Sequence, residues 1–430
     1  MSAVDAFAGL APCVHCGFCL QSCPTFLVTG DESDGPRGRI VLMQALARGE
    51  IPPTDRMLVH HLDRCLGCRA CEPVCPSGVS YAPALEEARR WFAEVRPVHA
   101  LTRMTLALFA EPMLRVPVLA IARFFRPLAQ VLAGKSRIGM MFGMLGATKS
   151  WGRGNGEGGR VTSPFPLPRS AGTVALFRGC IMDGLFSHVN NATARVLQAN
   201  GYSTVPARGQ GCCGALHTHA GLHEDAARLA RANVVAFSRV PNASIAVNSA
   251  GCGATLKEYG RLLADDPLAD QAKAMAGRVR DVSELLADTG PRAGGRLPLR
   301  VAYDPPCHLL HAQRIADAPV QMLDAVPGLL RLTHDEAELC CGSAGSYSLS
   351  EPELSRAILE RKVEAIRRAG PDVVATGNPG CIMQIGAGLR AAGLSTPVVH
   401  PVEVLDRSYA TAGFYQPTSC PPCLQHPSRS

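Results

Sequence analysis

The sequence lacks the features that would identify a membrane-spanning, secreted or nucleic-acid-binding protein. No uninterrupted apolar run reaches the ~20 residues that a spanning helix requires. The stretch Met1–Asp5 has neither the basic start nor the apolar core of a signal peptide, so we expect a reducing cytoplasmic compartment. Aromatic residues make up only 5 % of the chain. Because stacking aromatics do not accompany the basic residues, nucleic acid is not an expected partner.

A dinucleotide-binding fingerprint in its proper setting is also missing. Two stretches match its spacing formally, Gly154-x-Gly156-x-x-Gly159 and Gly386-x-Gly388-x-x-Ala391. The first stands before prolines that prevent a helix from starting, and the second lies within a predicted helix. We therefore expect no flavin or nicotinamide on this chain.

The chain has 430 residues, of which 47 % are hydrophobic and 18 % charged, as in a globular protein of about three domains. Its 18 cysteines stand in tight clusters, which argues against a disulfide scaffold. The net charge is +7, and residues 96–153 account for it with nine basic residues and the single acid Glu111. This stretch is either a helical connector with its apolar side packed inward and its basic residues in solvent, or a surface that docks on a partner or on anionic lipid.

Two cysteine runs near the N-terminus share one spacing, Cys-x-x-Cys-x-x-Cys-x-x-x-Cys-Pro. It is the ligand spacing of bacterial ferredoxins, in which the fourth cysteine of each run ligates the other cluster. Zinc sites use isolated Cys-x-x-Cys pairs with longer gaps. The spacing predicts two [4Fe–4S] clusters, one held by Cys13, Cys16, Cys19 and Cys75, the other by Cys65, Cys68, Cys71 and Cys23.

The C-terminal half contains an internal repeat. Its landmarks recur after 127, 128 and 129 residues: Cys180, Cys212-Cys213-Gly214 and Cys252 in one copy, and Cys307, Cys340-Cys341-Gly342 and Cys381 in the other. Apolar strand patterns alternate with helical ones, which predicts a small parallel sheet in each copy. The cysteines follow predicted strands, so they are expected at the ligand-binding edge of each sheet.

These repeat cysteines have two interpretations. They form a further iron–sulfur or thiol-redox centre, or they are small buried hydrophobes. Candidate non-cysteine ligands are Asp304, His308 and His311 in the second copy and His217, His219 and His223 in the first. A last pair, Cys420 and Cys423, belongs to a tail rich in Pro and Ser, and we expect that tail to be disordered.

Taken together, these motifs predict an α+β multidomain protein. We expect an α-helical ferredoxin-like domain at residues 1–95 and a connector with a Gly/Pro linker at residues 96–171. Two small cysteine-rich α/β domains with parallel sheets would follow at residues 172–296 and 297–412, and a tail at residues 413–430.

The two ferredoxin-type runs, the stretch Gly35–Ile40 and the two Cys-Cys-Gly copies resemble the glycolate oxidase iron–sulfur subunit from Cys13 to about Arg407. The resemblance implies an electron-transfer subunit of a complex that oxidises glycolate and, as a second substrate, D-lactate. Two flavin-bearing partner subunits would carry out the hydride chemistry, so no catalytic residue is expected here. The electrons would pass to a quinone or another respiratory acceptor at the cytoplasmic face of the inner membrane, where the chain would have peripheral contact.

Related groups remain alternatives at this point. They are the iron–sulfur subunits of lactate and glycerol-3-phosphate dehydrogenase complexes and the heterodisulfide reductase-like thiol/disulfide reductases. The broadest form of the repeat motif ends in Cys-x-x-Cys, whereas Cys252 and Cys381 here have no cysteine three residues later. This departure argues against a noncubane cluster. A protein that uses its clusters only to hold its fold is a third alternative.

Overall fold

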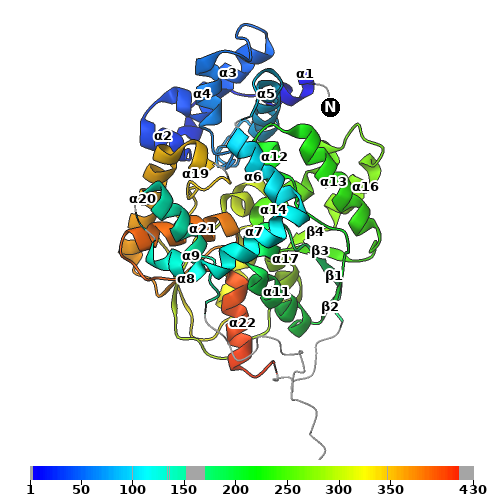
Figure 1. The fold of residues 1–430 in the computed structure, drawn as a ribbon, viewed down its shortest axis with the longest axis vertical. Coiled ribbons are helices and arrows are strands. Elements are labelled where there is room, and N and C mark those ends of the chain that lie inside the picture. Colours follow the sequence, from blue (N-terminus) through cyan, green and yellow to red (C-terminus); the bar gives the residue numbers. More distant parts are fainter. Residues whose placement is uncertain are drawn as a thin grey trace, which may run out of the picture.

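The computed structural model describes residues 3–98, 100–132, 134, 136–151, 170–345 and 347–415. The glycine-rich part of the predicted linker and the Cys420/Cys423 pair lie outside the described residues. Figure 1 shows a helical N-terminal unit above two sheet-containing repeats, with a layer of helices across the front.

The N-terminal unit is helical, as predicted for the ferredoxin-like part of the chain. Its helices are α1 (Ala3–Ala8), α2 (Pro24–Thr29), α3 (Pro36–Ala47), α4 (Arg56–Asp63) and α5 (Tyr81–Val95). Pro24 and Pro36 each occupy the first position of a helix, where the missing N–H costs no hydrogen bond. Asp55 caps α4, because its carboxylate accepts from the Leu58 amide at 2.8 Å. Buried leucines and Met43 join α3, α4 and α5 in one core.

The first repeat contains a four-stranded parallel sheet, which confirms the predicted class. Its strands β1 (Gly172–Leu176), β2 (Tyr202–Val205), β3 (Ser244–Val247) and β4 (Val279–Asp281) are ordered β2-β1-β3-β4. In the central strand Ala175 is paired with Val205 on one side and Ile245 on the other. The helices α11 (Ser187–Ala199), α13 (His223–Ser238), α14 (Ala250–Lys257) and α17 (Val282–Thr289) surround this sheet.

The second repeat has the same sheet. Its strands β5 (Arg300–Tyr303), β6 (Leu330–Leu332), β7 (Val373–Ala375) and β8 (Val398–Val399) are parallel and ordered β6-β5-β7-β8. Its helices include α18 (Asp317–Asp324), α20 (Pro352–Ala369), α21 (Pro379–Ala391) and α22 (Pro401–Thr411). The identical strand order confirms the duplication inferred from the cysteine spacing.

The two repeats share one hydrophobic core. Val174, Val196 and Leu286 of the first pack with Val301 and Leu405 of the second. Helix α11 lies beside α22, as both views show. The repeats also meet at the loops before their last cysteines, where the Ala250 amide donates to the Gly377 carbonyl at 3.1 Å.

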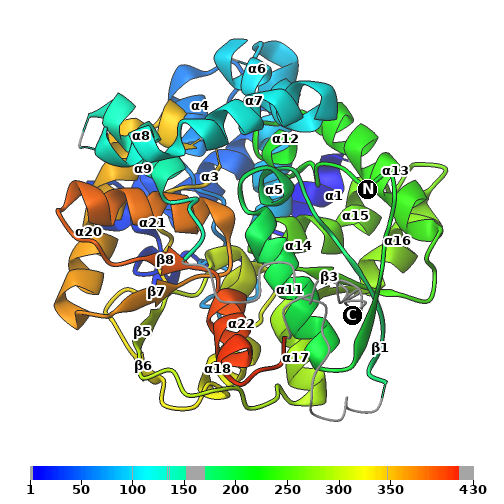
Figure 2. The ribbon, with the colours of Figure 1, turned by 60° about the horizontal axis from the view of Figure 1, so that its bottom comes forward.

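The connector forms four helices over one side of the repeats. They are α6 (Ala100–Ala110), α7 (Pro112–Phe124), α8 (Arg126–Val131) and α9 (Arg137–Gly146), the outer layer in Figure 2. Helix α9 is fixed to α21 by Arg390, whose guanidinium donates to the carbonyls of Gly143 and Gly146. Helix α7 packs Leu119 on Gly184, a position that has no room for a side chain.

The packing of α7 agrees only in part with the inward-packed interpretation of the connector, although elsewhere in the connector Leu106 and Ala129 are buried and Arg103 and Lys149 are exposed, as it predicts. Leu119 is buried, but Met113, Ile121 and Phe124 are exposed while Arg115 is buried. Among the described residues, no single helix is long and apolar enough to cross a membrane. The pair Thr102–Ala110 and Pro112–Phe124 meets the length and composition criteria together, but it is bent by 100°.

Candidate iron–sulfur and thiol sites

The two N-terminal cysteine loops share a backbone conformation. In the first loop, His15 and Gly17 have φ values of 54° and 84°. The corresponding residues of the second loop, Gly67 and Arg69, have φ values of 63° and 64°. Left-handed residues at these two places bend each Cys-x-x-Cys-x-x-Cys segment into a tight loop. Arg69 adopts this uncommon conformation with its side chain held by Glu72 and Glu258.

A first group of four thiols combines residues from both runs. The Cys13, Cys16, Cys19 and Cys75 residues line one hollow, together with Ile40, Tyr81 and Cys71 of the other expected set. Burial and the nearby sulfurs of Cys13, Cys16 and Cys75 raise the pKa of Cys19 to about 11. The structure therefore brings together the four residues that the spacing assigned to one cluster; we call them the first quartet.

A second group also combines the two runs and is more deeply buried. Burial, followed by the proximity of Cys68, Cys65, Glu72 and Cys23, raises the pKa of Cys71 well above the usual range of a thiol. Cys23 and Cys65 are buried, whereas Cys68 and Cys71 are partly buried. These four residues are the second quartet, and they are the set expected from the crossed spacing.

Positive charge and hydrogen-bond donors surround the second quartet. Burial opposes ionisation of Cys65, yet Arg39, Arg89, the Gly67 amide and the Tyr81 hydroxyl together lower its pKa. The Tyr81 hydroxyl lies 3.6 Å from the Cys65 sulfur, and Arg89 donates to the Cys65 carbonyl at 2.6 Å. Such groups favour a thiolate and tune a metal centre bound there.

A buried ion network holds the Cys23 segment. Arg39, only 1 % exposed, donates to the Thr25 hydroxyl at 3.0 Å and to the His61 carbonyl at 2.7 Å. The Thr25 hydroxyl donates to the Asp34 carbonyl at 2.6 Å. The fully buried Asp34 carboxylate accepts from Arg64 and from His61. The pattern of cysteines does not indicate this network, because the sequence does not reveal which arginines are buried.

In the first repeat all four cysteines converge. The sulfurs of Cys213 and Cys252 are 3.3 Å apart. A hydrogen bond with Cys212 and then burial raise the pKa of Cys180, with Cys252 also close by. Gly214, with a φ of 86°, provides the turn after the cysteine pair.

The second repeat has the same arrangement, with its thiols fully enclosed. The Cys307 and Cys340 sulfurs are 3.9 Å apart, and a hydrogen bond with Cys341 raises the pKa of Cys381. Gly342 provides the turn with a φ of 82°. We call these thiols the repeat quartets: Cys180, Cys212, Cys213 and Cys252 in the first, and Cys307, Cys340, Cys341 and Cys381 in the second.

Gln384 stands at the position where a Cys-x-x-Cys ending would place a second cysteine after Cys381. Gln384, three residues after Cys381, donates to the Ser355 hydroxyl at 3.0 Å. Asn378, three residues before Cys381, donates its side-chain amide to the Cys381 sulfur at 3.6 Å. The side chain that contacts the Cys381 sulfur is therefore the neutral amide of Asn378, which precedes the cysteine and was not predicted from the motif.

The candidate non-cysteine ligands are engaged in different contacts. Burial raises the pKa of Asp304 to about 7, although Lys362 Nζ lies 2.8 Å away. His311 Nε2 bonds the Glu338 carbonyl at 2.9 Å. His308 Nδ1 lies 3.5 Å from the Cys307 sulfur, and its ring stacks on His219 of the first repeat at 5.6 Å. His217 is buried and His223 is exposed at the surface, and partial desolvation lowers the pKa of both.

The second quartet is adjacent to the second repeat quartet. After burial, the largest influence that raises the pKa of Cys68 is the charge of Cys307, and Cys68 packs against the same apolar cluster as Cys307. Leu66 packs in one apolar cluster with Cys307 and Cys340. The first repeat quartet has a different neighbour, because Cys180 and Cys212 pack against Ala110 at the end of α6.

This combination of folds and thiols defines a class of iron–sulfur proteins, and comparison with known families agrees. Residues 9–79 match the family described as a 4Fe-4S dicluster domain. Residues 174–257 and 301–386 each match the family described as a cysteine-rich domain. The chain is therefore an iron–sulfur protein with a dicluster domain and two cysteine-rich domains.

Similarity over the whole length identifies the particular family. The chain is 36 % identical over 418 residues to the probable glycolate oxidase iron-sulfur subunit of Bacillus subtilis, covering 92 % of this chain and 93 % of the relative. It is 33 % identical over 411 residues to the glycolate oxidase iron-sulfur subunit of Escherichia coli, covering 94 % and 96 %. Lactate utilization protein A of Exiguobacterium is 29 % identical over 242 residues, covering 56 % and 99 %. The chain belongs to the family of glycolate oxidase iron–sulfur subunits.

Proposed function

We propose that this chain is the electron-transfer subunit of a complex that oxidises glycolate and, as a second substrate, D-lactate. Two flavin-bearing partner subunits would oxidise the hydroxy acid, and this chain would pass the electrons to a quinone or another acceptor at the cytoplasmic face of the membrane. Family membership supports the substrate class. The observation that carries the relay role is the contact between the second quartet and the second repeat quartet.

The two N-terminal quartets are the proposed ligands of the two [4Fe–4S] clusters. Each supplies four sulfurs from both cysteine runs, which is the donor set that such a cluster requires. When bound, these clusters accept and release one electron at a time, so they divide the two-electron oxidation of a hydroxy acid into single steps. Arg39, Arg89 and Tyr81 would stabilise negative charge at the second quartet.

The relay is tested on the anaerobically purified complex. Adding glycolate should reduce the flavins and then produce the paramagnetic signals of reduced cubane clusters. The proposal fails if the flavins are fully reduced while those signals never appear.

The crossed ligation is tested by single substitutions. Cys75→Ser should remove the cluster of the first quartet, although Cys75 belongs to the second run, and leave the other cluster in place. Cys71→Ser should have the opposite result. Cys420→Ser is the matched control, because this cysteine belongs to neither run. If Cys75→Ser instead removed the cluster of Cys65 and Cys68, the assignment would be wrong.

A thiol/disulfide reductase is a second candidate, favoured by the 3.3 Å separation of the Cys213 and Cys252 sulfurs. The isolated chain would then reduce disulfides, and Cys340→Ser with Cys341→Ser would abolish that turnover. Absence of turnover in the unsubstituted chain would eliminate this candidate.

A further inference from the structure

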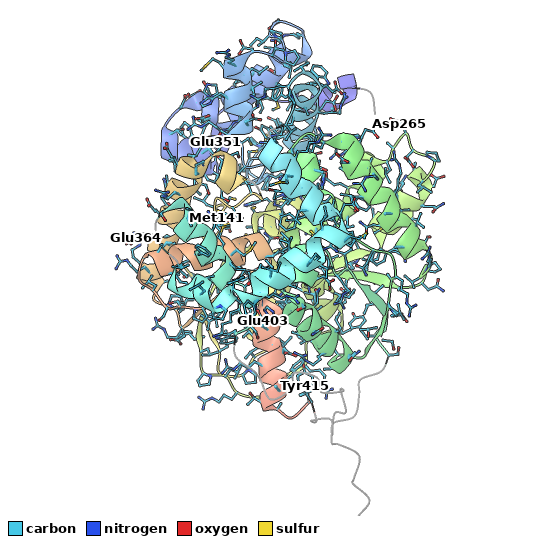
Figure 3. The ribbon with its side chains drawn as sticks, viewed as in Figure 1. Met141, Asp265, Glu351, Glu364, Glu403 and Tyr415 are labelled. Atoms are coloured by element: carbon cyan, nitrogen blue, oxygen red, sulfur yellow. The ribbon has the colours of Figure 1, made fainter. Side chains whose placement is uncertain are left out.

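The connector exposes many large apolar side chains on its four helices. On α7, Met113 is 90 % exposed, Phe124 79 % and Ile121 59 %. Exposed apolar side chains also occur on the neighbouring helices, among them Met141 of α9, which is labelled in Figure 3. We call the whole set the apolar face: Met104, Met113, Leu114, Val116, Val118, Ile121, Phe124, Phe125, Leu128, Leu132, Ile138 and Met141.

Several charged side chains of the same helices point toward the protein. Arg115 is buried and donates to the Phe109 carbonyl at 2.9 Å. Arg123 and Arg126 donate to carbonyls of Asp183 and Leu185 in the first repeat, at 3.0 and 3.3 Å. Arg115 thus bonds a carbonyl of α6, and Arg123 and Arg126 bond carbonyls of the first repeat, while the Met113, Ile121 and Phe124 side chains are exposed. A helix on a surface exposed to water would bury its apolar side chains and expose its charged ones. The exposed apolar side of α7 is therefore expected to contact an apolar phase or a partner.

Composition favours lipid over a protein partner. The pair α6–α7 meets the hydropathy criterion for a membrane segment, yet its 100° bend prevents it from crossing as one rod. It can instead lie in the plane of the interface with one side immersed.

The surrounding charge indicates which lipid. Residues 96–153 have nine basic residues and the single acid Glu111, which pairs with Arg228 at 3.3 Å. Arg103 and Lys149 are exposed, as is Arg96, which pairs with Asp63 at 3.0 Å. A basic border around an apolar face is complementary to anionic headgroups.

We propose that the apolar face docks on the surface of an anionic lipid bilayer. The inference deepens the proposed function and rests on it for the membrane acceptor, but binding itself requires no electron transfer. It would bring both repeat quartets close to the lipid, because Cys180 and Cys212 pack with Ala110 of α6, and Met140 of α9 packs against the cluster that contains Cys341 and Cys381.

The test is cosedimentation of the full, cluster-loaded chain and of its complex with vesicles. The vesicles contain either phosphatidylcholine alone or phosphatidylcholine with phosphatidylglycerol. We expect binding to the anionic vesicles that decreases with salt. Ile121→Glu with Phe124→Glu should weaken it at least tenfold, since both side chains would leave the acyl region. Arg103→Gln with Lys149→Gln should weaken it about fivefold per charge.

Matched controls are Met57→Glu and Leu330→Glu, which change exposed apolar residues elsewhere, at 61 % and 57 % exposure. They should bind as the unsubstituted chain does. The proposal is overturned if the unsubstituted chain and complex stay in the supernatant, if neutral vesicles bind equally well, or if the face variants still sediment. It is also overturned if those variants keep lipid binding and lose only the flavin subunits, because the face would then be a protein interface. Iron content and cluster signals in the same samples report separately on the proposed function.

Discussion

Replacing Asp34 by Asn removes a buried negative charge that several cations share. The carboxylate is fully buried; it accepts from Arg64, lies 3.0 Å from His61 Nδ1 and 3.6 Å from Arg39 Nη2. Asn has the same shape, so the substitution changes charge and leaves volume unchanged. Breaking a buried ion pair from one side typically costs about 3–5 kcal/mol, because the remaining charge stays buried without compensation. We expect the lower end of that range, since Arg39 keeps its bonds to Thr25 and the His61 carbonyl.

The assay is urea unfolding followed by the visible absorbance of the clusters, with iron counted in each preparation. The variant should unfold at lower urea and lose iron preferentially from the second quartet, because the network holds the segment that contains Cys23. Glu50→Gln is the matched control: Glu50 pairs with Arg48 at the surface, where such pairs contribute little.

A double-mutant cycle separates charge compensation from a general packing defect. Arg39→Met combined with Asp34→Asn removes both members of the pair. The double variant should therefore lose less free energy of unfolding than the sum of the losses in the two single variants. Strictly additive losses, or an Asp34→Asn chain as stable as the unsubstituted one, would refute the reasoning.

Three further outcomes follow from the geometry. Tyr81→Phe removes a hydrogen-bond donor to the Cys65 sulfur, so a redox titration should show a lower reduction potential for the second cluster alone. Tyr347→Phe is the control and should leave that potential unchanged, because the Tyr347 hydroxyl bonds the Arg64 carbonyl. Burial raises the pKa of Glu403, labelled in Figure 3, to about 7. The free energy of unfolding therefore decreases as the pH rises from about 4.5 to 7, because the folded state holds this proton more tightly than the unfolded chain. Glu403→Gln should be more stable by up to about 3 kcal/mol in urea unfolding at pH 8, and equal pH profiles of the two proteins would contradict this. Gly342→Ala places a side chain at a φ of 82° with its Cβ 2.8 Å from the Ser355 carbonyl oxygen, and should lower the free energy of unfolding by about 1–3 kcal/mol. Gly413→Ala is the control and should cost less, because its φ is 78° but no atom lies within 4 Å of the added Cβ.

Much of the fold could be predicted because its signals are local. The spacing of the cysteine runs and the 127–129-residue recurrence are properties of short segments, and the strand patterns that precede Cys180 and Cys307 became β1 and β5. The rule that parallel strands end at one edge placed two cysteines of each repeat there, Cys180 with Cys252 and Cys307 with Cys381. These inferences required no knowledge of how distant segments meet.

The surroundings of the sites could not be predicted in this way. The positions of Arg39 and Asp34 in a buried network depend on contacts between α3, α4 and the Cys23 segment, which no periodicity encodes. The connector illustrates the same limit. Its apolar and basic residues were evident in the sequence, but whether Arg115 or Phe124 faces the repeats depends on which backbone carbonyls lie within reach.

The duplication itself implies a division of roles between the repeats. Both have the same strand order and four convergent thiols, so their internal chemistry is alike. Their neighbours differ: both quartets adjoin the connector, through Ala110 and Met140 respectively, but Cys307 of the second also adjoins Cys68 of the second quartet. Because the surroundings of a redox site determine its potential and its partners, equal modules in unequal surroundings are expected to exchange electrons with different neighbours. The second repeat, whose Cys307 and Cys340 pack with Cys68, would be the one that communicates with the ferredoxin-like unit.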